Sequence, residues 1–255
     1  MPTFRLSCIC MTTPAPIQLL SYPDMAQPLA IQAVMFDLDG TLVNAIDDIE
    51  AALNAMLNDL DLPAVNQTFV GHTIGRGTER LVHETLQHVG ALPADAPIAP
   101  SAPLFQRALS GYQQHYARTN GQRSYVYPGV REGLDTLRQA GLPLACVTNK
   151  PVKPAHSLLM QLGLLPYFVC VHGGDSFARR KPDPLPLVET AKLLGSPLAH
   201  TLMIGDSSND AQAAQAAGCP VLLLGYGHNH GQPVQSVAAN GYLQSLADLR
   251  VQASI

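Results

Sequence analysis

Five charged side chains occur in short polar segments that stand out from a largely apolar chain. They are Asp37, Asp39, Lys181, Asp206 and Asp210. Carboxylates brought together in a protein interior repel one another unless a cation or a lysine lies among them. Carboxylate oxygens without cysteine or histidine favour Mg²⁺ over Zn²⁺. Such an ion would neutralise a carboxylate nucleophile and an incoming phosphate, so the residue types predict Mg²⁺-dependent phosphoryl transfer.

The elements that must position these residues alternate along the chain from Ile31 onward. Short apolar runs typical of buried strands lie at 33–36, 143–148, 168–172, 201–204 and 221–224. Helical patterns lie between them at 130–137, 158–162, 187–194 and 211–217, and Gly218 is the expected C-cap of the last. This alternation predicts an α/β fold, a Rossmann-like parallel sheet with helices on both faces.

The polar segments follow the predicted strands, and the strand ends of a parallel sheet share one edge. Asp37 and Asp39 follow the first strand, Thr148 and Asn149 follow the second, and Asp206 and Asp210 follow the fourth. Lys181 is expected at the start of a later helix. These side chains should therefore meet at one edge, where open parallel sheets bind their ligands.

Residues 44–124 interrupt the alternation, because their apolar residues recur only at helical spacing. We interpret them as an all-helical cap inserted after the first strand, able to cover the site as a lid. The catalytic core is then 31–43 and 125–255. Residues 1–30 are interpreted as a dispensable extension, with Met25 as a natural start.

Bulk composition excludes several classes of function. Hydrophobic residues make up 47% and charged residues 13% of the 255 residues, as in a compact globular protein. The net charge of −4 gives no basic surface for nucleic acid. No apolar run approaches the roughly 20 residues that cross a bilayer. We expect a cytoplasmic protein with neither nucleic-acid nor membrane partners, and the oligomeric state is not indicated.

The polar segments resemble the four signature motifs of the haloacid dehalogenase superfamily, which consists mainly of phosphatases. The resemblance runs from Ile31 to Leu243 in the expected order. It implies a Rossmann-like core with a helical cap, and it implies that Asp37 is a nucleophile that becomes an aspartyl phosphate. Asp39 would protonate the leaving oxygen and then activate water. An acid at this position favours ester hydrolysis over dehalogenation, because a halide leaving group needs no proton.

The same resemblance assigns the remaining site residues. Thr148 would hydrogen-bond the phosphate, and Lys181 would stabilise the charge on the phosphate and on Asp37. Mg²⁺ would be held by Asp37, the backbone carbonyl of Asp39 and Asp206. Asp210 would either bind the ion or support its ligands.

A finer resemblance, to the phosphoglycolate phosphatases of this superfamily, suggests 2-phosphoglycolate as the small phosphate ester that is hydrolysed. It is carried by 147–151, 173–175, 181–187, 205–210, 225–227 and the cap segment Gly75-Arg76-Gly77. Gly75, Arg76 and Asn149 are therefore predicted to bind substrate, with Arg76 on a substrate carboxylate. Alternatively, Arg76 faces solvent or pairs with Glu79.

Other functions remain open on the same scaffold. Asn44 replaces an aspartate that is frequent in the phosphoglycolate group, and it lies near the expected cap. A sugar-phosphate phosphatase and a phosphomutase are the enzymatic alternatives. A catalytically silent binding protein is the third, although it would have no need for the full set of charged residues.

Overall fold

The protein is built around a six-stranded parallel sheet. The computed structural model describes residues 17–21 and 28–252. The strands of this sheet follow the order β10–β9–β8–β3–β6–β7. Their bounds are β3 Ala33–Phe36, β6 Leu144–Val147, β7 Cys170–His172, β8 Thr201–Gly205, β9 Val221–Leu224 and β10 Gly241–Leu243. The predicted strands are confirmed, and β10 is an addition to them.

Helices cover both faces of the sheet, as predicted. They are α5 Val130–Gln139, α6 Val152–Gln161, α7 Leu185–Leu194 and α8 Ser208–Ala217. Because successive strand residues point to opposite faces, Val34 and Phe36 pack in one apolar cluster with α5 and α6, whereas Met35 packs in another with α7 and α8. Gly218 ends α8 with φ 78°, the left-handed conformation that favours glycine.

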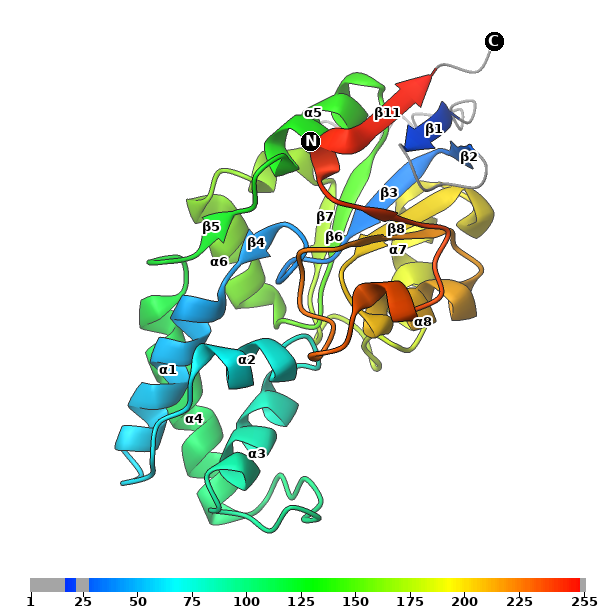
Figure 1. Cartoon of the computed structure of the whole chain (residues 1–255). Helices are drawn as coiled ribbons and strands as arrows, with labels where there is room; N and C mark the ends of the chain where they lie inside the picture. Colours follow the sequence, from blue (N-terminus) through cyan, green and yellow to red (C-terminus); the bar gives the residue numbers. More distant parts are fainter. Residues whose placement is uncertain (1–16, 22–27, 253–255) are drawn as a thin grey trace, which may run out of the picture.

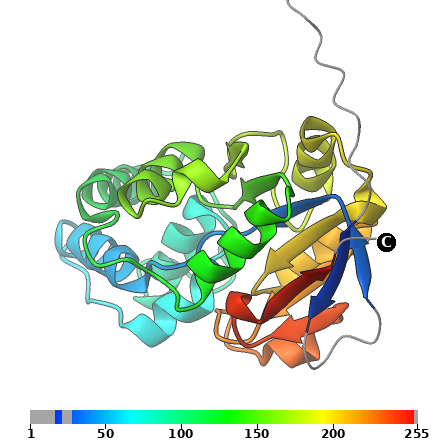
Figure 2. The same ribbon diagram turned by 90° about the horizontal axis from the view of Figure 1, so that it is seen from above.

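A helical cap lies beyond the carboxyl ends of the strands (Figures 1 and 2). Its helices are α1 Ile46–Asn58, α2 Gln67–Thr73, α3 Thr78–His88 and α4 Pro103–Thr119. The chain enters and leaves this module through two short antiparallel strands, β4 Val43–Asn44 and β5 Tyr125–Val126. The cap is therefore an insertion into the core and contains only helices between those two strands, as the apolar spacing predicted.

A second, three-stranded sheet corrects one prediction about the first 30 residues. β1 Ile17–Ser21 pairs antiparallel with β11 Leu249–Gln252 on one side and with β2 Leu29–Ile31 on the other. The interpretation of residues 1–30 as an extension separate from the core does not hold for β1 and β2, since β1 joins β2 to β11, which lies within the predicted core. Met25 lies outside the described residues.

Four short 3₁₀ helices complete the described structure: Leu165–Tyr167, Leu198–His200, Val234–Ser236 and Leu246–Asp248. Over the described ranges, no helix has the length and apolar character needed to cross a membrane.

Candidate active site

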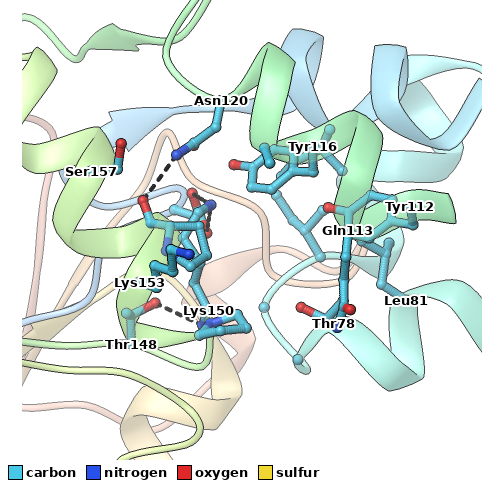
Figure 3. A pocket seen from close by; sticks show the side chains of 18 of the residues that line it. Thr78, Leu81, Tyr112, Gln113, Tyr116, Asn120, Thr148, Lys150, Lys153 and Ser157 are labelled. Carbon is cyan, nitrogen blue, oxygen red and sulfur yellow. Dashed lines mark hydrogen bonds and ion pairs between the residues drawn. The ribbon is translucent and has the colours of Figure 1, made fainter. Parts of the chain in front are cut away.

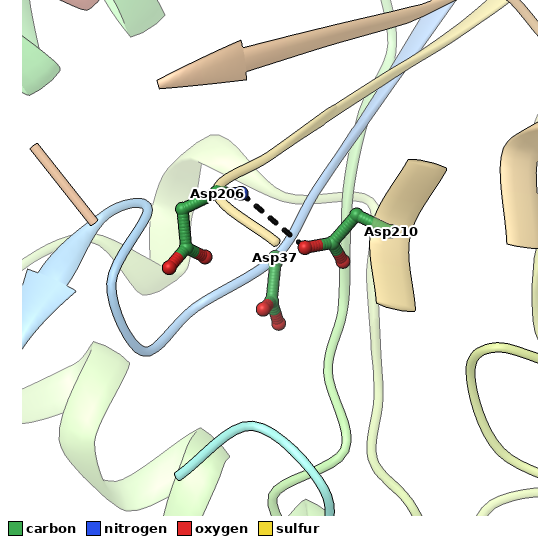
Figure 4. Close-up of side chains that lie close together, drawn as sticks. All are labelled: Asp37, Asp206 and Asp210. Carbon is green, nitrogen blue, oxygen red and sulfur yellow. Dashed lines mark hydrogen bonds between the residues drawn. The ribbon is translucent and has the colours of Figure 1, made fainter. Parts of the chain in front are cut away.

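Three buried carboxylates meet at the carboxyl edge of the sheet (Figure 4). Asp37 follows β3, Asp206 follows β8, and Asp210 lies in the first turn of α8. One oxygen from each lies within 4.8 Å of the others, and each residue is at most 6% exposed. The three side chains that sequence analysis placed at this edge are thus brought together, in a geometry that suits a cation with oxygen ligands.

Asp206 is fixed by hydrogen bonds to both of its carboxylate oxygens. Thr41 Oγ1 donates to Oδ1 at 2.9 Å, and the backbone amide of His228 donates to Oδ2 at 2.6 Å. The chain must pass close to this carboxylate, because a Cβ on Gly40 or on Gly227 would lie 2.2 Å from an atom of its side chain. The loop of Gly227 therefore borders the site.

Asp210 is held by the start of its own helix and by Lys181. It forms a capping box with Ser207, whose hydroxyl donates to Asp210 Oδ2 at 2.8 Å. The Lys181 ammonium lies 2.7 Å from Asp210 Oδ1 and 3.0 Å from Asp37 Oδ1. Lys181 itself precedes α7 by four residues, so it lies in the connecting loop and not at the helix start.

Burial and mutual repulsion shape the electrostatics of this cluster. Burial raises the pKa of Asp37 to about 6, with Lys181 opposing the rise and Asp210 adding to it. Burial, followed by the charges of Asp210 and Asp37, raises the pKa of Asp206 well above its usual range. Burial acts to lower the pKa of Lys181, but the two neighbouring carboxylates more than offset it and raise that pKa.

The charges of the carboxylate cluster formed by Asp37, Asp206 and Asp210 do not balance without a cation. Three carboxylates face one lysine, and every candidate ligand atom among the described residues of the cluster is an oxygen. The donor set therefore fits a hard divalent ion, whose positive charge would offset both the burial of the carboxylates and the repulsion between them.

Asp39 lies beside the carboxylate cluster and forms a buried ion pair that the sequence did not reveal. The Lys150 ammonium lies 2.7 Å from both Oδ1 and Oδ2 of Asp39. The side chains are only 5% and 11% exposed. The structure therefore buries Lys150 at the site.

A cavity of about 450 Å³ separates the core from the cap at this point (Figure 3). Asp37, Asp39, Thr148 and Lys150 line it from the core. Its cap side is mostly apolar and is formed by residues of α1, α3, α4 and the loop before α3. Thr148 is 4% exposed, and its Oγ1 accepts a 3.2 Å hydrogen bond from the backbone amide of Lys150. Of the catalytic residues predicted from the sequence, Asp37, Asp39 and Thr148 therefore line one cavity, and Lys181 contacts Asp37.

Two predicted substrate contacts are placed differently. The Asn149 amide donates to the backbone oxygens of Gly75, at 2.9 Å, and Lys181, at 2.8 Å. It therefore ties the cap loop to the core. Arg76 is not among the described residues that line the cavity, and its guanidinium lies 3.4 Å from Glu84.

The proposed partner of Arg76, Glu79, is also engaged elsewhere. Glu79 pairs with Arg180 of the core at 2.8 Å, so the alternative pairing with Arg76 is wrong. Gly75 does line the cavity, with φ 89°.

Thr41, Tyr116 and Lys150 lie at the site but were not predicted there, and the sequence contains a signal for Thr41 alone. Thr41 stands within the motif that contains both aspartates predicted to be catalytic, so its place beside Asp206 was open to inference. Tyr116 and Lys150 line the same cavity, yet they are 34 positions apart in the chain. Only the approach of α4 to the core brings them together.

Comparisons with known proteins agree with this geometry. Residues 34–224 match the model of the haloacid dehalogenase-like hydrolases. A phosphoglycolate phosphatase of Thiobacillus denitrificans is 41% identical over 221 residues, which are 87% of this chain and 95% of the relative. A plasmid-encoded phosphoglycolate phosphatase of Cupriavidus necator is 42% identical over 221 residues, 87% of this chain and 92% of that protein.

A solved structure shows the same arrangement. The crystal structure of a predicted phosphoglycolate phosphatase from Haemophilus somnus 129PT superposes with a TM-score of 0.79 at 32% identity. The match covers 86% of this chain and 96% of that one.

Proposed function

Because this chain belongs to the haloacid dehalogenase-like hydrolases and is a phosphoric monoester hydrolase, we propose that it hydrolyses 2-phosphoglycolate to glycolate and phosphate. The observation that carries the proposal is that Asp37, Asp39 and Thr148 line one cavity, while the Lys181 ammonium lies 3.0 Å from Asp37 Oδ1 in the adjoining carboxylate cluster. The relatives named phosphoglycolate phosphatase support the choice of substrate.

We propose Mg²⁺ as the ion of the carboxylate cluster. Asp37, Asp206 and the backbone carbonyl of Asp39 would hold it. Both oxygens of Asp210 already accept hydrogen bonds from the protein, from Lys181 and from Ser207, which favours a supporting role for that residue. When bound, Mg²⁺ supplies positive charge that offsets the carboxylates and the phosphoryl oxygens.

The protein's own residues would perform the transfer. The Asp37 carboxylate attacks phosphorus, and the bond to the ester oxygen breaks while Asp39 delivers a proton to that oxygen. Lys181 contacts Asp37 and lies where charge on the phosphoryl group must be stabilised. Thr148 lines the cavity and would donate its hydroxyl to the phosphoryl group. Asp39 then takes a proton from water, which attacks the phosphoaspartate and releases phosphate.

Phosphate release from a panel of esters tests this proposal. The panel contains 2-phosphoglycolate, phosphoserine, sugar phosphates and a nucleoside monophosphate, each with Mg²⁺ and then with EDTA. We expect Mg²⁺-dependent release with 2-phosphoglycolate far ahead. A different leading ester would replace the substrate and leave the reaction class intact. Transfer of phosphate between positions of one sugar, with little free phosphate, would indicate a phosphomutase.

A further inference from the structure

The cavity holds polar groups that the phosphoryl-transfer chemistry does not use. Lys150 is one of two lysines among the described residues that line it, the other being the exposed Lys153. A lysine ammonium can donate three hydrogen bonds. Lys150 donates two of them, to Asp39 Oδ1 and Oδ2. A buried ammonium at the wall of a substrate cavity is well placed to bind a second anionic group.

Tyr116 adds an independent observation at the same place. The residue is 6% exposed and lines the cavity from α4, and its buried hydroxyl has no hydrogen-bond partner among residues 17–21 and 28–252. The Lys150 ammonium lies 5.1 Å from the centroid of its ring. Burial, together with the Asp39 charge, raises the pKa of Tyr116 well above its usual range, so the hydroxyl keeps its proton. It is therefore an unused donor on a side chain whose ring lies next to the Lys150 ammonium in the same cavity (Figure 3).

The proposed reaction places the substrate carboxylate near these two groups. The ester oxygen must come within about 2.6–3.2 Å of Asp39 to receive its proton. In 2-phosphoglycolate a single methylene group joins that oxygen to the carboxylate. The Lys150 ammonium is 2.7 Å from both oxygens of Asp39. The carboxylate can therefore reach this ammonium while the ester oxygen is within reach of Asp39.

The other nearby cations are less suited to this role. The Lys181 ammonium contacts Asp37 and Asp210, on the side where the phosphoryl group must lie. Arg76 is turned to Glu84. Lys153 is solvent-exposed, so a contact with it would be weakened by water and salt.

We propose that Lys150 and the Tyr116 hydroxyl form a carboxylate subsite that selects phosphate monoesters of small 2-hydroxy acids. This inference rests on the proposed function, because it takes Asp39 as the group that protonates the ester oxygen. The substrate carboxylate would then be bound by Lys150 of the core and Tyr116 of the cap, and not by Arg76 as the sequence suggests. The two sides of the cavity would then both contact the substrate only when the cap covers the core.

The test compares 2-phosphoglycolate with ethyl phosphate, in which a methyl group replaces the carboxylate. The readout is the ratio of the two kcat/KM values. Lys150→Met should lower this ratio about 10- to 100-fold, the range for a charge-assisted hydrogen bond. Tyr116→Phe keeps the ring and should lower it about 3- to 10-fold. Lys153→Met removes a charge from the same cavity and serves as the matched control, with a change of less than about 2-fold.

The outcomes separate this inference from the proposed function. An equal loss of kcat/KM for both esters in Lys150→Met would show that Lys150 only supports Asp39, and would overturn the subsite while 2-phosphoglycolate remained the substrate. A wild-type protein that does not prefer 2-phosphoglycolate over ethyl phosphate would overturn both. If Lys150→Met does not fold, Lys150→Gln carries the same expectation.

Discussion

Replacing Asp37 with asparagine is expected to stabilise the metal-free protein while it abolishes phosphatase activity. The carboxylate is buried with Asp206 and Asp210, and this raises its pKa from 3.8 to about 6. At 1.36 kcal/mol per pH unit, the rise corresponds to about 3 kcal/mol lost when Asp37 ionises in the folded protein. The neutral amide of asparagine avoids that loss, but it cannot form a phosphoaspartate.

The sign of the effect determines its pH dependence. A carboxyl group whose pKa is raised by folding destabilises the folded state progressively as the pH rises through the interval from 3.8 to about 6. The advantage of Asp37→Asn should therefore be close to its full value at pH 8, about half as large at pH 5, and absent below the unfolded pKa.

Urea denaturation in EDTA at pH 5 and pH 8 measures the free energy of unfolding of both proteins. Adding Mg²⁺ at pH 8 should then stabilise the wild type more than the variant, because the variant has lost one of the proposed ligands. A variant that is less stable than the wild type in EDTA at pH 8 would refute the electrostatic reasoning. So would an advantage that does not change with pH.

Three further substitutions probe other parts of the site. Asp39→Asn should lower kcat for 2-phosphoglycolate by at least about 100-fold, the lower range for a general acid–base group, and a loss below 10-fold in a phosphate-release assay would contradict its role. Gly40 has φ 89°, and Gly40→Ala would place a methyl group 2.2 Å from Asp206 Oδ2. We therefore expect a lower Tm and weaker Mg²⁺ binding in a thermal-shift titration, and an unchanged Mg²⁺ affinity would contradict the close approach. Arg180→Ala breaks the exposed ion pair with Glu79 that joins the core to the cap, a pair that contributes less than about 1 kcal/mol to stability. We expect KM for 2-phosphoglycolate to rise severalfold, and an unchanged KM would show that the pair does not contribute to cap closure.

The core of the site was predictable because its positions follow from strand order. Asp37 and Asp206 each come directly after a short apolar run, and the carboxyl ends of parallel strands lie at one edge of a sheet. Once the apolar runs are recognised as strands of one parallel sheet, Asp37 and Asp206 are expected at the same edge of that sheet. The cap was predictable for a similar reason, since helical spacing without strand-like runs is a local pattern.

Contacts between side chains distant in the chain were not predictable in this way. Lys150 pairs with Asp39 across 111 positions, and Asn149, expected on the substrate, instead holds the backbone of Gly75. Neither contact can be recognised in the local sequence. The Lys150–Asp39 pair depends on how the loops after β3 and β6 lie next to each other, and the Asn149–Gly75 contact depends on how closely the cap loop approaches the core.

The sequence by itself determined the α/β core, the helical cap and the aspartates and lysine that suit phosphoryl transfer, since local periodicity and strand order are sufficient for these. Only the tertiary structure decided that β1 completes a sheet with β11 and that Lys150 and Tyr116 face one cavity. Pairing between chain ends, and contact between a cap helix and a core loop, depend on packing that no single segment encodes.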